Sequence, residues 1–247
     1  LDGTNGFAIV GPADNSWTGE YVADAGDLNG DGIDDILLGA AGLDTADATD
    51  AGAAFVVFGQ DTVNGSDFDA VTYLADLDGT DGFVMTGLQD GSSLGEAITS
   101  VGDVNGDGID DMLIGAASDA ANGLDMAGQA FLVFGKDTGA DGDFLASVDL
   151  GALDGTDGYV FTGVQPDDAF GAAVSGAGDI NGDGISDMLI GATTNAGAPS
   201  PDYPTGATYV VYGGADTLAD LDGADGSTDG IIDMAVYYAL AAQDLVA

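Results

Sequence analysis

The sequence predicts an all-β fold, organised as a β-propeller-like array of four-stranded antiparallel blades. Two observations lead to this prediction. The chain repeats itself every 76 residues, and each copy holds four short runs of β-branched and aromatic residues bounded by Gly, Asp and Asn. The repeats lack sustained helical periodicity, so blades of strands fit the pattern better than a helical solenoid does.

The repeat is clearest in two segments. The first seven residues return twice, each time 76 positions further on, and so does the nine-residue Asp-rich segment 27–35. In the third copy of that segment Ser186 replaces an Asp. The predicted organisation is therefore repeat one at residues 1–76, repeat two at 77–152, repeat three at 153–220, and a degenerate, truncated fourth repeat at 221–247.

Four strands are expected in each copy. In repeat one the apolar runs lie at residues 7–10, 21–23, 36–40 and 54–59, and each has the length and composition of a strand. The stretches 60–76 and 136–151 read as longer connections between blades. The Pro residues cluster between 199 and 204, where repeat three carries a two-residue insertion, and this favours a surface loop.

The charge of the chain excludes several classes of function. The chain has 44 Asp and Glu residues but a single basic residue, Lys136, so its formal net charge is −43. Nucleic-acid binding through phosphates needs several Lys or Arg, and so does docking on an anionic membrane. Without Cys or His there is no thiol nucleophile, no Ser-His pair and no zinc site of the usual kind. Carboxylate chemistry remains, either binding of hard cations or acid–base catalysis.

The Asp-rich segments have the composition of a calcium-binding loop. Oxygen-bearing side chains occupy positions one, three, five and nine, a Gly at position six permits a tight turn, and the carbonyl of position seven can complete the shell. The predicted ligands are Asp27, Asn29, Asp31, Ile33 and Asp35 in repeat one, Asp103, Asn105, Asp107, Ile109 and Asp111 in repeat two, and Asp179, Asn181, Asp183, Ile185 and Asp187 in repeat three.

Position twelve distinguishes these segments from an EF-hand. An EF-hand carries a bidentate Glu there, on an exiting helix. Here an apolar residue of a strand-like run stands at position twelve, Leu38 in the first copy, so we expect a β-hairpin loop. Asp-Gly turns that hold no metal are the alternative. A fourth candidate site, degenerate in sequence, consists of Asp225, Ser227, Asp229, Ile231 and Asp233.

These motifs resemble the FG-GAP repeats of integrin alpha chains and of many bacterial proteins. The Phe-Gly pair is Phe170-Gly171, and the Gly-Ala of the second motif appears as Gly39-Ala40, Gly115-Ala116 and Gly191-Ala192, each without the family's Pro. The resemblance covers residues 1 to about 213. It implies a β-propeller with calcium in its hairpin loops, and a role in extracellular adhesion or scaffolding.

Blade number sets the chain apart from that family. Integrin-type propellers close with seven blades, whereas this sequence holds three copies and a remainder. It is therefore a fragment, an unusually small propeller, or a chain that completes its sheets with another copy of itself. Exposed strand edges favour association, so self-assembly is the expected outcome.

Together these features predict a calcium-stabilised extracellular structural or adhesion module, secreted or at the cell surface, whose partner is another copy or another surface protein. A glycan- or protein-binding propeller fragment is the alternative, with Trp17 as the candidate stacking residue, although a lone Trp more often has a packing role. We do not expect an enzyme, because the two Glu, Glu20 and Glu96, occupy equivalent places in two repeats. The longest nearly apolar run, 234–242, is too short for membrane insertion.

Overall fold

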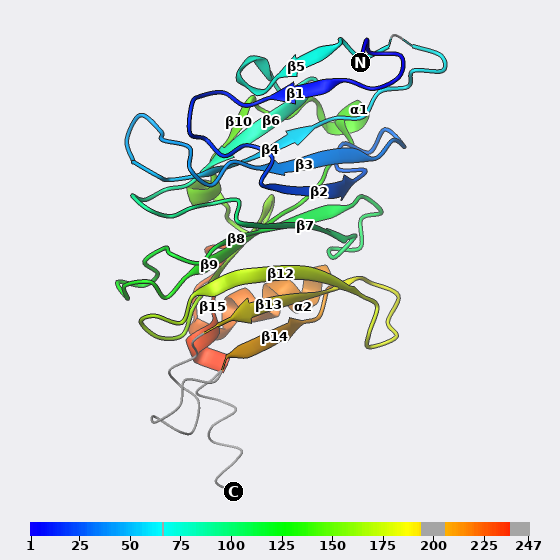
Figure 1. The fold of residues 1–247 in the computed structure, drawn as a ribbon. Coiled ribbons are helices and arrows are strands. Elements are labelled where there is room, and N and C mark those ends of the chain that lie inside the picture. The colour runs from blue at the N-terminus through cyan, green and yellow to red at the C-terminus, as the bar shows by residue number, and fades with distance from the viewer. Residues whose placement is uncertain (66, 194–205, 238–247) are drawn as a thin grey trace, which may run out of the picture.

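A computed structural model describes residues 1–65, 67–193 and 206–237, whose regular structure is mostly β-strand (Figure 1). The strands form one two-stranded, one three-stranded and two five-stranded sheets. The all-β prediction is confirmed. No helix among the described residues is both long and apolar enough to span a bilayer.

The sheets are named here in chain order. The terminal pair consists of β1 (Ala8–Val10) and β5 (Val71–Tyr73). The first sheet has the order β10 (Ser147–Val148), β6 (Gly82–Thr86), β4 (Ala53–Val57), β3 (Asp35–Gly39), β2 (Tyr21–Gly26). The second sheet has the order β15 (Ile231–Asp233), β11 (Gly158–Thr162), β9 (Gln129–Val133), β8 (Asp111–Ala116), β7 (Ala97–Gly102). The third sheet is β12 (Phe170–Gly178), β13 (Asp187–Ala192), β14 (Ala207–Val211).

Helices are short and lie in the connections. The 3₁₀ helices are η1 (Leu74–Asp76), η2 (Leu150–Ala152) and η3 (Gly223–Asp225), and the α-helices are α1 (Thr138–Asp141) and α2 (Ala215–Asp222). The connections 60–76 and 136–151 also contain the short strands β5 and β10. Runs of two or three residues are too short for an alternating pattern to reveal them, so the sequence predicted connections there.

The two five-stranded sheets combine strands from successive repeats. The first strand of repeat two, β6, pairs antiparallel with β4, the last predicted strand of repeat one, and β11 pairs with β9 in the same way. A five-stranded sheet therefore does not coincide with one 76-residue repeat, although we expected one four-stranded unit in each repeat. Internal periodicity gives the length of the unit, whereas only the pairing of strands shows where one sheet ends and the next begins.

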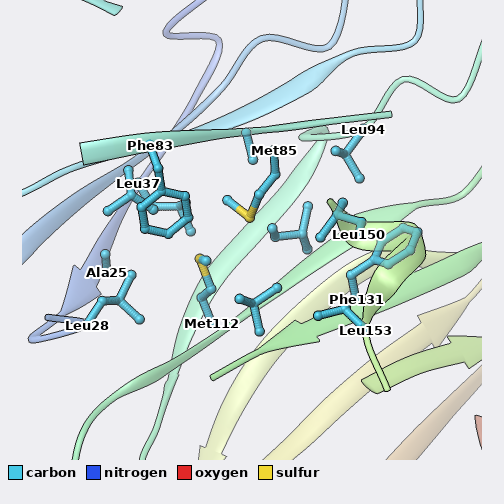
Figure 2. Close-up of a cluster of buried hydrophobic side chains, with 14 of the residues drawn as sticks. Ala25, Leu28, Leu37, Phe83, Met85, Leu94, Met112, Phe131, Leu150 and Leu153 are labelled. Atoms are coloured by element: carbon cyan, nitrogen blue, oxygen red, sulfur yellow. The ribbon is translucent and has the colours of Figure 1, made fainter. Parts of the chain in front are cut away.

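The sheets are stacked face to face. Their first strands β2, β7 and β12 lie side by side, and the stack runs from the terminal pair to the third sheet (Figure 1). Apolar side chains fill the space between neighbouring sheets. Figure 2 shows one such layer, in which Leu37, Phe83 and Met85 of the first sheet meet Met112 and Phe131 of the second sheet.

Two further layers complete the core. One joins the second sheet to the third, and includes Leu132, Phe161 and Ile190. The other places Ile9 of the terminal pair against Leu38 and Phe55 of the first sheet, so the terminal pair covers part of that sheet's free face. The predicted Pro-rich loop at 199–204 and the tail beyond Tyr237 lie outside the described residues.

Candidate metal-binding loops

The three Asp-rich segments, called here the Asp loops, occupy equivalent places in the three large sheets. Loop one (27–35) connects β2 to β3, loop two (103–111) connects β7 to β8, and loop three (179–187) connects β12 to β13. Each pair of strands is antiparallel, with a register irregularity just before the loop. The expected hairpin setting is therefore present in all three copies, and the exiting segment is a strand.

The first Asp of each loop is the point around which the backbone turns. In loop one, the carboxylate of Asp27 accepts the amide N–H of Asp31 at 3.0 Å and that of Gly32 at 2.8 Å. Gly30 and Gly32 have φ of +73° and +88°, a region that glycine enters without the steric cost of a Cβ. The same two bonds recur from Asp107 and Gly108 to Asp103, and from Asp183 and Gly184 to Asp179.

Positions three and five join the same cluster of polar atoms. The Asn29 side-chain oxygen accepts the Asp31 amide N–H at 2.9 Å, and the Asn29 side-chain nitrogen donates to the Asp31 carboxylate at 3.2 Å. The Asp31 N–H donates to side-chain oxygens of both Asp27 and Asn29. The side chains of positions one, three and five therefore surround a single turn. The arrangement repeats at Asn105 with Asp107 and at Asn181 with Asp183.

Position nine lies apart from the other three and is buried. Asp35 accepts the amide N–H of Leu28 at 2.9 Å and that of Gly59 at 2.8 Å, so it ties the loop to the end of β4. Asp111 and Asp187 make the corresponding pairs of bonds, to Val104 and Gly135 and to Ile180 and Gly213. The sequence predicted a ligand here, and the structure shows in addition a bracing role that the sequence did not reveal.

Burial raises the pKa of the position-nine carboxyl in loops one and two. Loss of solvent raises the pKa of the Asp35 carboxyl to about 7, although the Gly59 and Leu28 amides favour its ionised form, and the charges of Asp31 and Asp27 add to the rise. The same causes raise the pKa of Asp111 to about 8. Each of these carboxylates would gain from a nearby cation, because a positive charge favours the ionised form.

The chemistry of the donors suits a hard cation. Each loop offers two exposed or half-exposed Asp carboxylates, one Asn amide, one main-chain carbonyl and the buried Asp, all of them oxygen ligands of the kind calcium prefers. Among the described residues, however, no three acidic side chains converge closely enough to form a ready-made metal cluster. The carboxylates instead accept hydrogen bonds from backbone N–H groups. Each carboxylate oxygen keeps a further lone pair that could bind a cation. The donor set fits calcium in its chemistry, and the side-chain oxygens would have to come closer together to bind an ion.

The fourth predicted site has a different setting. Segment 225–233 begins at the last residue of η3, and its last three residues form β15, which pairs parallel with β11. There is no hairpin at this segment, and Asp233 accepts the N–H of Ala235 where the other ninth positions bind back to their loops. β15 therefore occupies the place that β10 has in the first sheet, and the setting of this candidate site differs from that of the three Asp loops.

Neighbouring Asp loops are linked through position eight. The Asp110 carboxylate in loop two accepts the amide N–H of Asp27 in loop one at 3.0 Å, and the Asp110 N–H donates to the Asp27 carbonyl at 3.3 Å. In loop three the Ser186 N–H donates to the Asp103 carbonyl of loop two at 3.1 Å. The three loops thus form one continuous row along an edge of the stack.

Sequence reasoning missed a buried acid outside the loops. Asp119 follows β8 and is 1% exposed, and neither of its carboxylate oxygens makes a hydrogen bond of ordinary geometry. The Ser92 hydroxyl is also buried without such a bond, although it lies close enough to lower the pKa of Asp119 slightly. Burial dominates and raises that pKa to about 6. Leu43 occupies the equivalent position in repeat one, so the repeat pattern gives no sign of an acid at this place.

The two Glu lie near each other although they are 76 residues apart in sequence. Glu20 precedes β2 and Glu96 precedes β7, and these strands are neighbours. Burial raises the pKa of Glu96, and the negative charge of Glu20 adds to the rise. This proximity follows from the repeat geometry, because equivalent positions of adjacent sheets face each other.

The only Lys and the only Trp have distinct surroundings. Lys136 donates from Nζ to the Asp143 carbonyl at 2.8 Å and lies 4.7 Å from the centroid of the Phe144 ring. Trp17 lies in the loop before β2, with its ring against Gly42, and 59% of its surface is exposed. The sequence favoured a packing role for Trp17, whereas the structure exposes most of the side chain.

Comparison with known proteins gives distant similarities over most of the chain. Integrin alpha-4 of Xenopus laevis is 30% identical over 186 residues, which are 75% of this chain. Integrin alpha-5 of the same organism is 28% identical over 176 residues, 70% of the chain. These similarities support an integrin-like repeat protein. No family model matches the chain.

A second kind of relative was not anticipated from the sequence. Phosphatidylinositol-glycan-specific phospholipase D of Dictyostelium discoideum is 27% identical over 198 residues, 79% of this chain. The chain spans a fifth or less of the length of each of these relatives, 20% of the phospholipase and 14% and 15% of the two integrins. The shared part is therefore a module within much larger proteins.

Proposed function

We propose that this protein is a calcium-stabilised extracellular module of the FG-GAP type, with stacked sheets that act as the blades of a β-propeller. Its role is adhesion or assembly through contacts with other proteins, including copies of itself. The integrin relatives support this role, and the exclusion of nucleic acid by the charge of −43 is consistent with it. We do not propose catalysis, because Glu20 and Glu96 occupy equivalent places in two repeats and the matched region is only 20% of the phospholipase relative's length.

One observation carries the calcium proposal. The same oxygen-rich loop adopts the same hydrogen-bond pattern at three equivalent hairpins, although the surrounding residues differ. Turns without a ligand need one acceptor to close, whereas these loops place four oxygen-bearing side chains in and around a nine-residue turn. In this proposal each bound ion joins two adjacent strands of a sheet, so its binding free energy contributes to folding.

Thermal unfolding tests the proposal directly. With calcium at about 100 times its dissociation constant, each independent site adds about 2.7 kcal/mol to the free energy of unfolding. We expect a large rise in Tm with millimolar calcium over excess chelator at constant ionic strength, and a smaller rise with magnesium. An equal rise in Tm with calcium and with magnesium would mean that the ions only screen charge, and it would refute calcium-specific binding in the loops.

A set of variants separates the loops from general charge. The combined variant Asp31→Asn, Asp107→Asn and Asp183→Asn removes position five from all three loops. It is expected to abolish most of the calcium-dependent rise in Tm. The matched control removes three exposed carboxylates elsewhere, at Asp14, Asp125 and Asp143, and should keep the rise. Similar behaviour of the two variants would contradict the assignment.

Glycan binding is a second candidate, favoured by the exposed indole of Trp17. An exposed aromatic face offers a stacking surface for a sugar ring, and the surrounding loop is open to solvent. Binding to a glycan array that disappears in Trp17→Ala, while Tm is unchanged, would support this function. Absence of binding by the natural sequence would remove the candidate.

A further inference from the structure

Among the described residues, three buried side-chain atoms lack a hydrogen-bond partner of ordinary geometry, and all three lie at one place. They are both carboxylate oxygens of Asp119 and the hydroxyl oxygen of Ser92. Asp119 is 1% exposed and Ser92 is 0% exposed. The two side chains are close enough for Ser92 to influence the pKa of Asp119. Buried polar groups without a partner are rare in folded proteins, so this cluster requires an explanation.

The cluster lies where two loops meet. Ser92 belongs to the loop between β6 and β7, and Asp119 belongs to the loop between β8 and β9. Gln89 joins these loops, because its side-chain nitrogen donates to the Ala120 carbonyl at 3.0 Å. Leu94, two residues after Ser92, lies in the apolar layer of Figure 2. Asp loop two is at the other end of β7 and β8, so the cluster is separate from the predicted calcium ligands.

Backbone hydrogen bonds hold Asp119 in this position. Its N–H donates to the Ala116 carbonyl at 3.1 Å, and its carbonyl accepts the Gly128 N–H at 2.9 Å. The equivalent Leu43 in repeat one makes the same two backbone bonds, and its side chain packs against apolar residues. The Asp119 carboxylate therefore occupies a place that an apolar side chain fills in repeat one.

Repeat two differs from the other repeats at this place. In repeat one the Ser16 hydroxyl lies 2.8 Å from the Thr18 hydroxyl, and Leu43 carries no charge. In repeat three Asp168 stands at the position of Ser92, and its carboxylate accepts two main-chain N–H groups. The counterpart of Asp119 in repeat three lies outside the described residues. Within the described part of the chain, an unpartnered acid beside an unpartnered hydroxyl occurs in repeat two alone.

The chain has no basic side chain with which to neutralise this carboxylate. Lys136 is its single basic residue, and Lys136 donates to the Asp143 carbonyl and lies against the Phe144 ring. The Ser92 hydroxyl can donate one hydrogen bond, so at least one oxygen of Asp119 stays without a donor. Burial raises the pKa of Asp119 to about 6, so the carboxyl is ionised at pH 8. Buried charges in proteins are paired or bound to metal ions.

We propose that Asp119 and Ser92 bind a monovalent metal cation at the junction of the β6–β7 and β8–β9 loops. The carboxylate and the hydroxyl supply oxygen ligands, and main-chain carbonyls of the two loops complete the shell. Hard cations take ligands of this kind. The charge of the site selects a monovalent ion, because a divalent ion beside a single carboxylate would leave a net positive charge buried.

Such an ion would stabilise the passage of the chain from the first sheet to the second. The loop that carries Ser92 connects β6 of the first sheet to β7 of the second sheet, and the ion would join this loop to the one that follows β8. Its binding free energy adds to the stability of the fold. The net charge of −43 raises the local concentration of small cations, which favours occupancy.

A buried water molecule is the alternative occupant. Water can donate two hydrogen bonds, and buried waters bind two to four polar groups of this kind. Water carries no charge, however, and leaves the ionised carboxylate without a counterion. A water molecule in the site would make stability insensitive to the kind of cation in the buffer, whereas a metal ion would make it depend on that cation.

The first test compares Tm in sodium, potassium and choline chloride at pH 8, at one ionic strength and with excess chelator. Choline is too large for a buried site, so it serves as the reference cation. With sodium at about ten times its dissociation constant, the folding equilibrium constant rises about elevenfold. For a chain of this size we expect Tm to rise by about 3–6 °C over choline. The ion with the larger effect, sodium or potassium, is the better ligand.

Three variants assign the effect to the site. Asp119→Asn removes the charge and should have the same Tm in sodium and in choline. In choline it should be more stable than the natural sequence, and sodium should narrow that difference. Asp125→Asn, an exposed change in the same loop, should keep the full rise. Ser92→Ala removes one ligand and leaves the carboxylate, so it should raise the sodium concentration that gives half of the effect.

Three outcomes would overturn the proposal. Equal Tm of the natural sequence in all three salts would leave water as the occupant. A sodium effect of the same size in Asp119→Asn would place the ion elsewhere. A calcium-dependent rise in the combined variant of the three Asp loops, lost when Asp119→Asn is added, would replace the monovalent ion with a divalent one. Failure of the calcium test on the loops leaves these results unaffected, because the sodium test contains chelator.

Discussion

Asp119→Asn is expected to stabilise the protein at neutral pH. The Asp119 carboxyl is buried without a hydrogen-bond partner of good geometry, and its pKa is raised from 3.8 to about 6 in the folded state. A folded-state pKa above the unfolded value means that ionisation costs stability as pH rises. Since one pKa unit corresponds to 1.36 kcal/mol, the cost above pH 6 approaches about 3 kcal/mol.

The predicted pH profile is specific. Asn has nearly the same shape as Asp but carries no charge, so the variant avoids the ionisation cost. The difference in unfolding free energy between variant and natural sequence should approach about 3 kcal/mol at pH 8, decrease as pH falls from about 6 towards the unfolded value of 3.8, and vanish only well below 3.8, where Asp119 is protonated in both states.

Urea unfolding monitored by Trp17 fluorescence or circular dichroism measures this difference, in choline chloride at fixed ionic strength and fixed calcium concentration. Asp125→Asn, an exposed change in the same loop, controls for the general gain from removing one negative charge. A pH-independent gain, or equal gains in the two variants, would refute the assignment of Asp119 as a buried ionisable group. A loss of stability at pH 8 would show that a cation or solvent satisfies the carboxylate.

Three further changes test the packing and the loops. Met112→Ala removes a fully buried side chain between the first and second sheets and should cost about 2–5 kcal/mol in urea unfolding; a cost below 1 kcal/mol would contradict the face-to-face packing. Asp187→Ala leaves the buried Gly213 N–H without an acceptor and should cost about 1–3 kcal/mol, whereas Asp216→Ala on the exposed face of α2 should cost little. Trp17→Ala should leave Tm within about 1 °C, because the indole is mostly exposed, and a larger fall would return Trp17 to a packing role.

The repeat pattern predicted the strands well and the sheets incompletely. The apolar runs at 21–23, 36–40 and 54–59 became β2, β3 and β4, because β-branched residues between Gly and Asp have few alternatives to an extended conformation. Pairing is a contact between segments far apart in the sequence. For this reason the partnership of β6 with β4 could not be read from either segment alone.

In the Asp loops, too, contacts between residues close in the sequence could be predicted, whereas contacts between distant residues could not. Positions one, three and five surround one backbone segment, and their hydrogen bonds lie within six residues, so these bonds depend on short-range spacing. The role of the same side chains as calcium ligands stays a prediction. Position nine binds Gly59, which is 24 residues away, and its bracing role became visible only in the fold. Segment 225–233 has the spacing of the other loops but begins at the end of the helix η3. Its last three residues pair parallel with β11 and do not form a hairpin.

The sequence by itself determined the strand-forming segments, the composition of the Asp loops and the exclusion of whole classes of ligand, because these depend on residue type and short-range spacing. Only the tertiary structure decided which strands share a sheet, which apolar residues remain exposed at the ends of the stack, and that Asp119 is buried without a partner. The physical reason is that burial and pairing are properties of the packed chain. Leu28, Val104 and Ile180 occupy the same place in three repeats, and only the sheet that follows each one determines whether it reaches solvent.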